Sequence, residues 1–139
     1  MVKVFLASHG HLASGMKSSV DVLLGASTAL TVYDAYLDEP LDQGFEAALA
    51  AYIASLNEDD TLVMCSDLYG GSVNQQMALF LERPNTYLVA GVNLGFILEL
   101  VLKTEISKTA LQEIIADSQK ALCLVELEKI DLASINDFF

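Results

Sequence analysis

Short apolar runs alternate along the chain with longer segments in which apolar residues recur every three or four positions. Apolar runs of this length are typical of strands buried on both faces, and the longer spacing is typical of helices. The runs predict strands at residues 2–8, 29–36, 61–66, 86–90 and 121–127. The helical spacing predicts helices at residues 12–24, 40–56, 73–83, 94–103 and 107–119. This alternation predicts an α/β fold with a doubly wound, mostly parallel sheet and helices on both faces.

Residues that begin or end helices stand at several of these bounds. Gly25 is placed to cap the C-terminus of the first helix, and Pro40 suits the first turn of the second. Ser72 can cap the N-terminus of the third helix, and Pro84 ends that unit. Because the connections are short and no repeat or linker interrupts them, we expect a single domain over residues 1–139.

Composition and charge narrow the class of protein. Of the 139 residues, 53% are apolar, which is enough for one domain with a substantial core. The net charge of -12 argues against nucleic acid or an anionic membrane surface as a partner, because either needs a basic patch. Neither a membrane-spanning apolar run nor a signal-peptide pattern is found, so we expect a cytoplasmic protein. Cys65 and Cys123 lie in apolar runs, where we expect free thiols.

Three loops follow the carboxyl ends of expected strands, and a parallel sheet brings these ends to one edge. The first loop holds His9 and Gly10, the second runs from Asp67 to Ser72, and the third covers residues 91–94. Ligands of open α/β sheets bind at this edge. We therefore expect the chemistry of the protein to lie where the three loops meet.

His9 is the candidate nucleophile, and we interpret it as the carrier of a phosphoryl group. A neutral imidazole attacks phosphorus through the nitrogen with a free lone pair, so its other nitrogen should donate a hydrogen bond. Asp67 is the natural acceptor, and it would also stabilise the positive charge that develops on the ring. Backbone N–H groups of Gly10, Gly71 and Ser72, with the Ser72 hydroxyl, could hold the phosphoryl oxygens. Such a site needs no cofactor, because phosphoryl transfer depends mainly on positioning and charge stabilisation.

Each of these residues also has a simpler interpretation. His9 and His11 can be solvated loop residues, Asp67 can accept backbone amides only, and Gly71 can serve a tight turn. Ser72 by itself is better explained as a helix cap. A metal site at His9 and His11 would lack a third ligand nearby in the sequence, so we expect no metal.

Two other classes of protein use the same residues or the same fold. His9, Asp67 and Ser72 have the composition of a hydrolase triad, but the run 70–74 has Asn74 where a nucleophile elbow needs glycine. A non-catalytic flavodoxin-like binding or signalling module would share the fold, since a fold alone implies no function.

The three loops together resemble a known family. The segments Ala7–Gly10, Asp67–Ser72 and Gly91–Leu94 are similar, in order and over almost the whole chain, to mannose-type enzyme IIA proteins. These are components of the mannose, fructose and sorbose branch of the bacterial phosphoenolpyruvate-dependent sugar phosphotransferase system. The resemblance implies that His9 receives a phosphoryl group from the phosphocarrier HPr. It implies that His9 then passes the group to an enzyme IIB, which phosphorylates sugar entering through membrane permease subunits.

The resemblance also assigns roles to other residues. It implies that Asp67 orients His9, that Ser72 lies beside the phosphoryl group, and that residues 121–127 are exchanged as a strand within a homodimer. Val73 and Gly95 depart from the family pattern, which often has prolines there, and the departures affect loop stiffness and the docking surface. Because no enzyme IIB domain follows in this sequence, we expect the acceptor to be a separate polypeptide. A related alternative is the phosphotransferase subunit of dihydroxyacetone kinase, although glycine after the histidine favours the sugar system.

Overall fold

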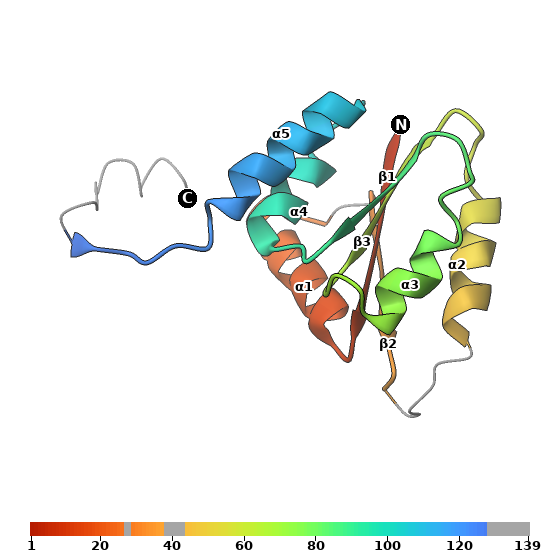
Figure 1. The fold of residues 1–139 in the computed structure, drawn as a ribbon, viewed down its shortest axis with the longest axis horizontal. Helices are drawn as coiled ribbons and strands as arrows, with labels where there is room; N and C mark the ends of the chain where they lie inside the picture. The colour runs from red at the N-terminus through yellow and green to blue at the C-terminus, as the bar shows by residue number, and fades with distance from the viewer. Residues whose placement is uncertain (27–28, 38–43, 128–139) are drawn as a thin grey trace.

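The computed structural model of the protein describes residues 1–26, 29–37 and 44–127. Over these residues strands alternate with helices (Figure 1). The strands are β1 (Val2–His9), β2 (Leu30–Ala35), β3 (Thr61–Ser66) and β4 (Thr86–Ala90). The helices are α1 (Leu12–Leu24), α2 (Gly44–Ala54), α3 (Ser72–Ala78), α4 (Leu94–Val101) and α5 (Lys108–Gln119). None of the helices in the described residues is long and apolar enough to cross a membrane.

The four described strands are all parallel and lie in the order β2-β1-β3-β4. From β1 the chain first forms β2 on one side, and then crosses to the other side of β1 to form β3 and β4. The strand order therefore reverses between β1 and β3. Open α/β sheets bind their ligands at the carboxyl ends of the strands beside such a reversal.

Alternate residues of β1 point to opposite faces of the sheet and build two separate cores. Val4 and Leu6 join the core that α1, α4 and α5 cover, whereas Phe5 and Ala7 join the core that α2 and α3 cover (Figure 1). All four side chains are buried. A strand buried on both faces needs the continuous apolar run that the sequence shows. The predicted doubly wound α/β fold, with a parallel sheet between two helical layers, is confirmed.

Side-chain caps and a glycine set the ends of three helices. α1 ends before Gly25, whose φ of 81° lies in the left-handed region that favours glycine. Asn93 caps α4, since its side chain accepts a hydrogen bond from the Phe96 amide at 2.8 Å. Ser107 caps α5 in the same way, since its hydroxyl oxygen accepts a hydrogen bond from the Ala110 amide at 3.1 Å. Pro40, expected in the first turn of α2, lies outside the described residues.

The prediction for α3 is wrong at both ends. Gly71 occupies the N-cap position, and Ser72 is the first helical residue, without a side-chain cap bond. The helix ends at Ala78, before the predicted end at residue 83. After Ala78 the chain forms turns, because the amides of Phe80 and Leu81 donate to carbonyl oxygens three residues back instead of four. The Arg83 guanidinium group donates hydrogen bonds to the backbone carbonyl oxygens of residues 57 and 60 at 2.9 and 3.2 Å. These tertiary bonds tie the turn after α3 to the start of β3.

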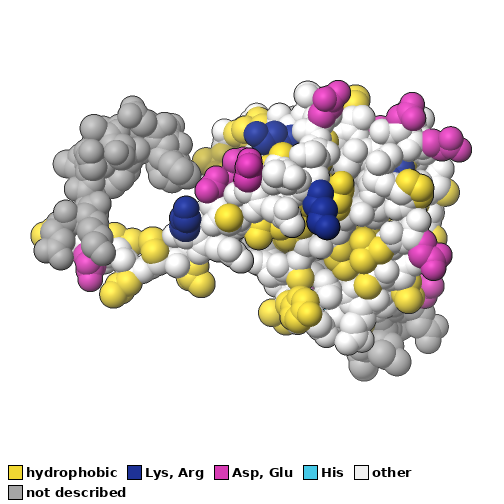
Figure 2. Space-filling model, turned by 45° about the horizontal axis from the view of Figure 1, so that its top comes forward, with side chains coloured by type: hydrophobic (Ala, Val, Ile, Leu, Met, Phe, Trp, Pro, Cys, Tyr) yellow, Lys and Arg dark blue, Asp and Glu magenta, His cyan; other side chains and the backbone are white. Residues whose placement is uncertain are grey.

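The segment at residues 121–127 forms no strand in this chain, contrary to the prediction. It leaves α5 and runs away from the sheet, and apolar side chains are exposed along it (Figures 1 and 2). The exposed apolar side chains are Leu122, Leu124, Val125 and Leu127. β4 is consequently an edge strand of the described sheet. Exchange of the segment with a partner subunit stays a prediction.

The two cysteines are free thiols, as the sequence predicts. Cys65 is buried in β3, and burial raises the pKa of its thiol. A buried thiol with a raised pKa is inert. Cys65 therefore serves as part of the core.

Candidate functional site

The candidate site lies where the strand order reverses. His9 is the last residue of β1, and Asp67 directly follows the last residue of β3. The register pairs Ala7 with Ser66, so the two strands end side by side. Parallel pairing of β1 and β3 thus brings together two polar residues that lie far apart in the sequence.

Asp67 makes two hydrogen bonds with His9. Its Oδ2 atom lies 2.9 Å from the ring Nδ1 of His9 and 2.9 Å from the backbone nitrogen of the same residue. The other carboxylate oxygen accepts the backbone amide of Leu68 at 3.0 Å. An ionised carboxylate only accepts hydrogen bonds, so Nδ1 carries the proton and Nε2 keeps its lone pair. Asp67 therefore fixes both the orientation and the tautomer of His9.

The carboxylate is held in its ionised form although it is nearly buried. Burial by itself would raise the pKa of Asp67, but hydrogen bonds from the backbone and the ring of His9 outweigh it and hold the pKa below its ordinary value. Only 8% of the Asp67 side chain is exposed, against 41% of the His9 side chain. The site therefore has a nearly buried, negatively charged carboxylate and an imidazole that is open to solvent.

Ser72 lies at the Nε2 edge of the ring, and Tyr36 stacks on its face. The Ser72 hydroxyl oxygen is 3.3 Å from Nε2 of His9, and the Tyr36 hydroxyl donates to that oxygen at 2.9 Å. The Tyr36 ring stacks on the imidazole, with 5.2 Å between ring centroids and 26° between planes. Gln76, one turn into α3, donates its side-chain amide to the Tyr36 hydroxyl at 3.1 Å. Ser72 was predicted at the site, whereas Tyr36 and Gln76 were not.

No signal in the sequence singles out Tyr36 or Gln76. Tyr36 follows an ordinary strand, and its contacts depend on a φ of 62°, in the left-handed region that a bulky residue rarely adopts. Gln76 is an ordinary polar residue within a predicted helix. Both contacts arise only when the end of β2 meets the start of α3.

Two buried serines support the loops of the site. Ser8 donates its hydroxyl to the Gly10 carbonyl at 3.0 Å and accepts the Ala13 amide at 2.7 Å, which joins the turn after His9 to the start of α1. Ser66 donates to the side chain of Asn74 at 3.0 Å, which joins β3 to α3. Both serines lie within strands that we predicted from apolar runs, and no sequence motif distinguishes them from the neighbouring strand residues.

The two predicted glycines have different surroundings. Gly10 has a φ of 63°, and its amide donates to the Ala35 carbonyl at 2.8 Å. That amide already has a protein acceptor, and a phosphoryl contact from Gly10 stays a prediction. Gly71 lies against the imidazole, since a Cβ atom there would be 3.4 Å from Cε1 of His9. The absence of a side chain at Gly71 leaves His9 room to sit over the loop.

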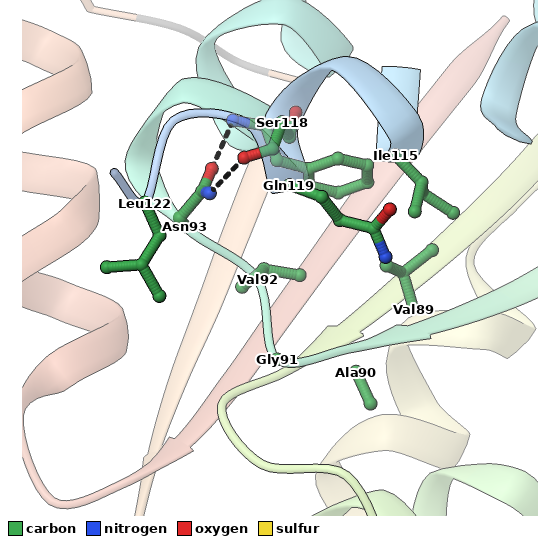
Figure 3. A pocket seen from close by; sticks show the side chains of 10 residues that line it. Val89, Ala90, Gly91, Val92, Asn93, Ile115, Ser118, Gln119 and Leu122 are labelled. Carbon is green, nitrogen blue, oxygen red and sulfur yellow. Dashed lines mark hydrogen bonds between the residues drawn. The ribbon is translucent and has the colours of Figure 1, made fainter. Parts of the chain in front are cut away.

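The third loop bonds to other parts of the fold. The amides of Gly91 and Val92 donate to the carbonyl of Ser66, and the Asn93 side chain donates to the carbonyl of Ser118 at 2.8 Å (Figure 3). This loop lines a pocket of about 240 Å³ between β4, α4 and α5. Hydrogen bonds thus join the first two predicted loops, whereas the third loop contributes to a pocket with apolar side chains such as Val89 and Ile115.

His11 forms a second histidine–aspartate pair. Its Nδ1 lies 3.1 Å from Oδ2 of Asp34, and its side chain is 79% exposed. Ser14 donates its backbone amide and its hydroxyl to the same carboxylate. Burial would raise the pKa of Asp34, but these hydrogen bonds and that of His11 hold it below its ordinary value. The sequence predicted His11 as a solvated loop residue, and its side chain is exposed but also pairs with Asp34.

The geometry around His9 suits two kinds of chemistry. The Nε2 lone pair can attack an electrophile directly, as a phosphoryl carrier requires, or can accept a proton from the Ser72 hydroxyl, as a hydrolase requires. The Ser72–His9 distance of 3.3 Å is slightly longer than the usual range for an activated nucleophile and its base.

The sequence and the fold match proteins of the phosphotransferase system. The family profile described as PTS system fructose IIA component matches residues 3–119. A Klebsiella pneumoniae protein assigned as a phosphoenolpyruvate-dependent sugar phosphotransferase system permease is 28% identical, with a TM-score of 0.77 over 88% of this chain and 90% of that one. A comparison with curated proteins finds no match.

Two further solved structures share the fold. One is a mannose/sorbose specific IIA subunit from Enterococcus faecalis, 23% identical, with a TM-score of 0.74 over 93% of this chain and 98% of that one. The other is a PTS IIA protein associated with the fucose utilization operon of Streptococcus pneumoniae, 24% identical, with a TM-score of 0.76 over 92% and 94% of the two chains. Since the family profile covers most of the sequence, the chain belongs to the fructose and mannose family of IIA components of the phosphotransferase system.

Proposed function

We propose that His9 carries a phosphoryl group from HPr to an enzyme IIB. Membership of the IIA family supports a phosphotransferase role in sugar uptake. The observation that carries the choice of residue is the hydrogen bond between Nδ1 of His9 and Asp67 at 2.9 Å. This bond leaves the lone pair on Nε2, and the exposure of the ring lets a protein donor approach it.

The transfer needs only residues already described. Nε2 of His9 attacks the phosphorus atom of the phosphorylated donor, a nitrogen–phosphorus bond forms, and the bond between phosphorus and the donor breaks. The Nδ1 proton stays in its hydrogen bond to Asp67, and the carboxylate offsets the positive charge that develops on the ring. The same steps run in reverse when the group leaves His9 for the nucleophile of enzyme IIB.

Ser72 and Gly71 are the proposed contacts for the phosphoryl oxygens. The Ser72 hydroxyl lies beside Nε2, where the new bond would form. Gly71 has no side chain to block that space, and its amide makes only a long bond, 3.5 Å, to the Leu68 carbonyl. The Ser72 hydroxyl can donate to a phosphoryl oxygen once Nε2 is occupied.

Exposed apolar side chains around the site support protein partners. Leu68 and Tyr69 directly follow Asp67, and Leu12 begins α1 next to the His9 turn; all three are exposed. Apolar and aromatic side chains are typical of the centre of protein interfaces. HPr and enzyme IIB would both dock on this surface, because each must reach Nε2 of His9. We expect both encounters to take place in the cytoplasm.

A homodimer with an exchanged last strand is part of the proposal. The exposed apolar segment at residues 121–127 and the open edge of β4 each need a partner. The pocket lined by Val89, Ile115 and Leu122 lies beside that edge. In a reciprocal exchange, the segment of each copy would cover the β4 edge of the other.

Intact-mass analysis after incubation with phosphoenolpyruvate, enzyme I and HPr tests the proposal. We expect one acid-labile phosphoryl group on the wild type and on His11→Ala, and none on His9→Ala. The His11 variant is a matched control, since it also removes a histidine that pairs with an aspartate. An unmodified wild type in the presence of phosphorylated HPr would overturn the proposal.

Two alternatives give other results. If the chain serves dihydroxyacetone kinase, the ADP-bearing subunit of that kinase would remove the phosphoryl group and enzyme IIB would not. If the site is a hydrolase, a fluorophosphonate would label Ser72, because Ser72 and His9 already lie within reach of each other. We expect no such labelling.

A further inference from the structure

We propose that Tyr36 and Gln76 are positioning residues that aim the Ser72 hydroxyl proton at Nε2 of His9 and, after phosphorylation, at the phosphoryl group. This inference rests on the proposed function only for its second part. The observation behind it is a chain of hydrogen bonds that starts in α3, crosses to the end of β2 and returns to Ser72.

The donors of this chain have a fixed order. The side-chain nitrogen of Gln76 can only donate, so the Tyr36 hydroxyl oxygen is the acceptor of that bond. Tyr36 has one hydroxyl proton, and it goes to the Ser72 oxygen. Ser72 thereby accepts from Tyr36, and its own proton is left for Nε2 of His9. Asp67 completes the order, because it holds the ring proton on Nδ1 and leaves Nε2 as an acceptor.

Phosphorylation changes the acceptor but not the order. Once Nε2 is bonded to phosphorus, its lone pair is gone, and the Ser72 proton can turn to a phosphoryl oxygen. A hydroxyl group donates a stronger hydrogen bond to a charged oxygen than to a neutral one. A Ser72 hydroxyl that Tyr36 already orients loses less freedom in making that bond, so the phosphorylated form is favoured.

The backbone of Tyr36 supports a functional role. A tyrosine with a φ of 62° lies in a region that L side chains with bulk rarely adopt. Asn85 also has a positive φ among the described residues, but asparagine tolerates this conformation. The amide of Gly10 donates to the carbonyl of Ala35, which fixes the residue before Tyr36 to the turn after His9. The fold thus holds Tyr36 in an unfavourable conformation that places its ring and hydroxyl on the site.

Tyr36→Phe removes the hydroxyl and keeps the ring that stacks on His9. Gln76→Leu removes the donor at the start of the chain. Gln75→Leu is its matched control, because the neighbouring Gln75 donates to the Gly70 carbonyl instead. We would measure the equilibrium of phosphoryl exchange with HPr by intact mass for these variants, for Ser72→Ala and for the double variant with Tyr36→Phe and Ser72→Ala.

We expect Tyr36→Phe to shift the exchange equilibrium about fivefold against the phosphorylated chain, the effect of one hydrogen bond of ordinary strength. Gln76→Leu should shift it in the same direction by less, and Gln75→Leu should leave it unchanged. In the Ser72→Ala background, Tyr36→Phe should have no further effect. Equal effects of Tyr36→Phe with and without the Ser72 hydroxyl would overturn the proposal, since two independent contributions add.

A second measurement separates this inference from the proposed function. In the unphosphorylated protein, the nitrogen-15 chemical shift of His9 Nε2 should change in Tyr36→Phe and not when Ser72→Ala is already present. If the wild type takes no phosphoryl group from HPr but this shift pattern appears, the phosphocarrier role fails and the positioning role stands. If the wild type is phosphorylated but neither the exchange equilibrium nor the chemical shift responds to Tyr36→Phe, the positioning role fails alone.

Discussion

Asp67→Asn tests the role of charge at the candidate site with little change in shape. The variant keeps the size of the side chain and an oxygen that can accept from His9, but it removes the negative charge. The wild-type Oδ2 accepts both the backbone amide and Nδ1 of His9, each at 2.9 Å. Of these two bonds, only the ring bond gains strength as positive charge develops during attack on phosphorus.

The expected magnitude follows from the ring bond. A hydrogen bond to a charged group contributes about 1.5–3 kcal/mol, and one between neutral groups about 0.5–1.5 kcal/mol. Exchanging a charged acceptor for a neutral one therefore costs about 1.5 kcal/mol in the transition state. Since 1.36 kcal/mol is a factor of ten in rate, we expect phosphorylation of His9 to slow about tenfold.

Asp34→Asn is the matched control for this variant. Asp34 pairs with His11 and Ser14 in the way that Asp67 pairs with His9, and the same charge is removed. Rates of phosphoryl transfer from HPr, measured by rapid quench and intact mass, should fall for Asp67→Asn and stay near wild type for Asp34→Asn. Equal slowing of both would refute the reasoning, because it would point to loss of surface charge rather than to support of the ring.

The effect of Asp67→Asn on stability should depend on pH. The folded-state pKa of Asp67 lies below its ordinary value of 3.8, so the ionised carboxylate stabilises the fold above that value. This stabilisation is lost as pH falls through the folded-state pKa. The difference in unfolding free energy between wild type and Asp67→Asn should therefore be full at neutral pH and shrink below about pH 3.8. A difference that grows on acidification would contradict the direction of this pKa shift.

Three further predictions concern the core, the loop beside His9 and the C-terminal segment. Phe45→Ala should lower the unfolding free energy by about 3–5 kcal/mol in chemical denaturation, because Phe45 is fully buried; a loss below about 1 kcal/mol would contradict its place in the core. Gly71→Val should slow phosphorylation by roughly ten- to a hundredfold through displacement of the ring, whereas Gly71→Ala should be tolerated, since its Cβ lies 3.4 Å from His9 Cε1. Removal of residues 121–139 should give a monomer in sedimentation velocity, and an unchanged dimer would argue against strand exchange.

Two strands could be predicted from sequence with their exact bounds because two independent signals coincide there. β3 and β4 agree with their predicted bounds, since each is an apolar run with polar or turn residues at both ends. α3 was predicted too long because Leu79 and Phe80 continue the apolar pattern of Met77, yet the helix ends at Ala78 and the Leu79 side chain is exposed. Arg83 holds the turn after that helix through bonds to residues far away in the sequence, and helical spacing carries no record of such bonds.

Some residues of the candidate site could likewise be predicted from the sequence, and others could not. His9 and Asp67 could be predicted because the ends of adjacent parallel strands define one place in the fold, whatever the loops do. Ser72 was predicted at the site, but its role as a cap is wrong, because Gly71 takes the cap position and frees the hydroxyl for His9. Tyr36 could not be predicted, since its contacts require a left-handed backbone conformation that the sequence gives no reason to expect from a tyrosine.

The groups that contact His9 suit a carrier better than a tight binding site. Its ring bonds an aspartate and a serine and stacks on a tyrosine, and none of these three side chains is a cation. A lysine or arginine at the same place would add a charge-assisted hydrogen bond of about 1.5–3 kcal/mol to the phosphorylated state, and retention would rise by roughly ten- to a hundredfold. Tighter binding of the phosphoryl group would slow its departure to the next protein. In the proposed role, the Asp67 carboxylate at Nδ1 and the neutral Ser72 hydroxyl beside Nε2 would keep His9 reactive and leave the phosphoryl group free to pass to the next protein.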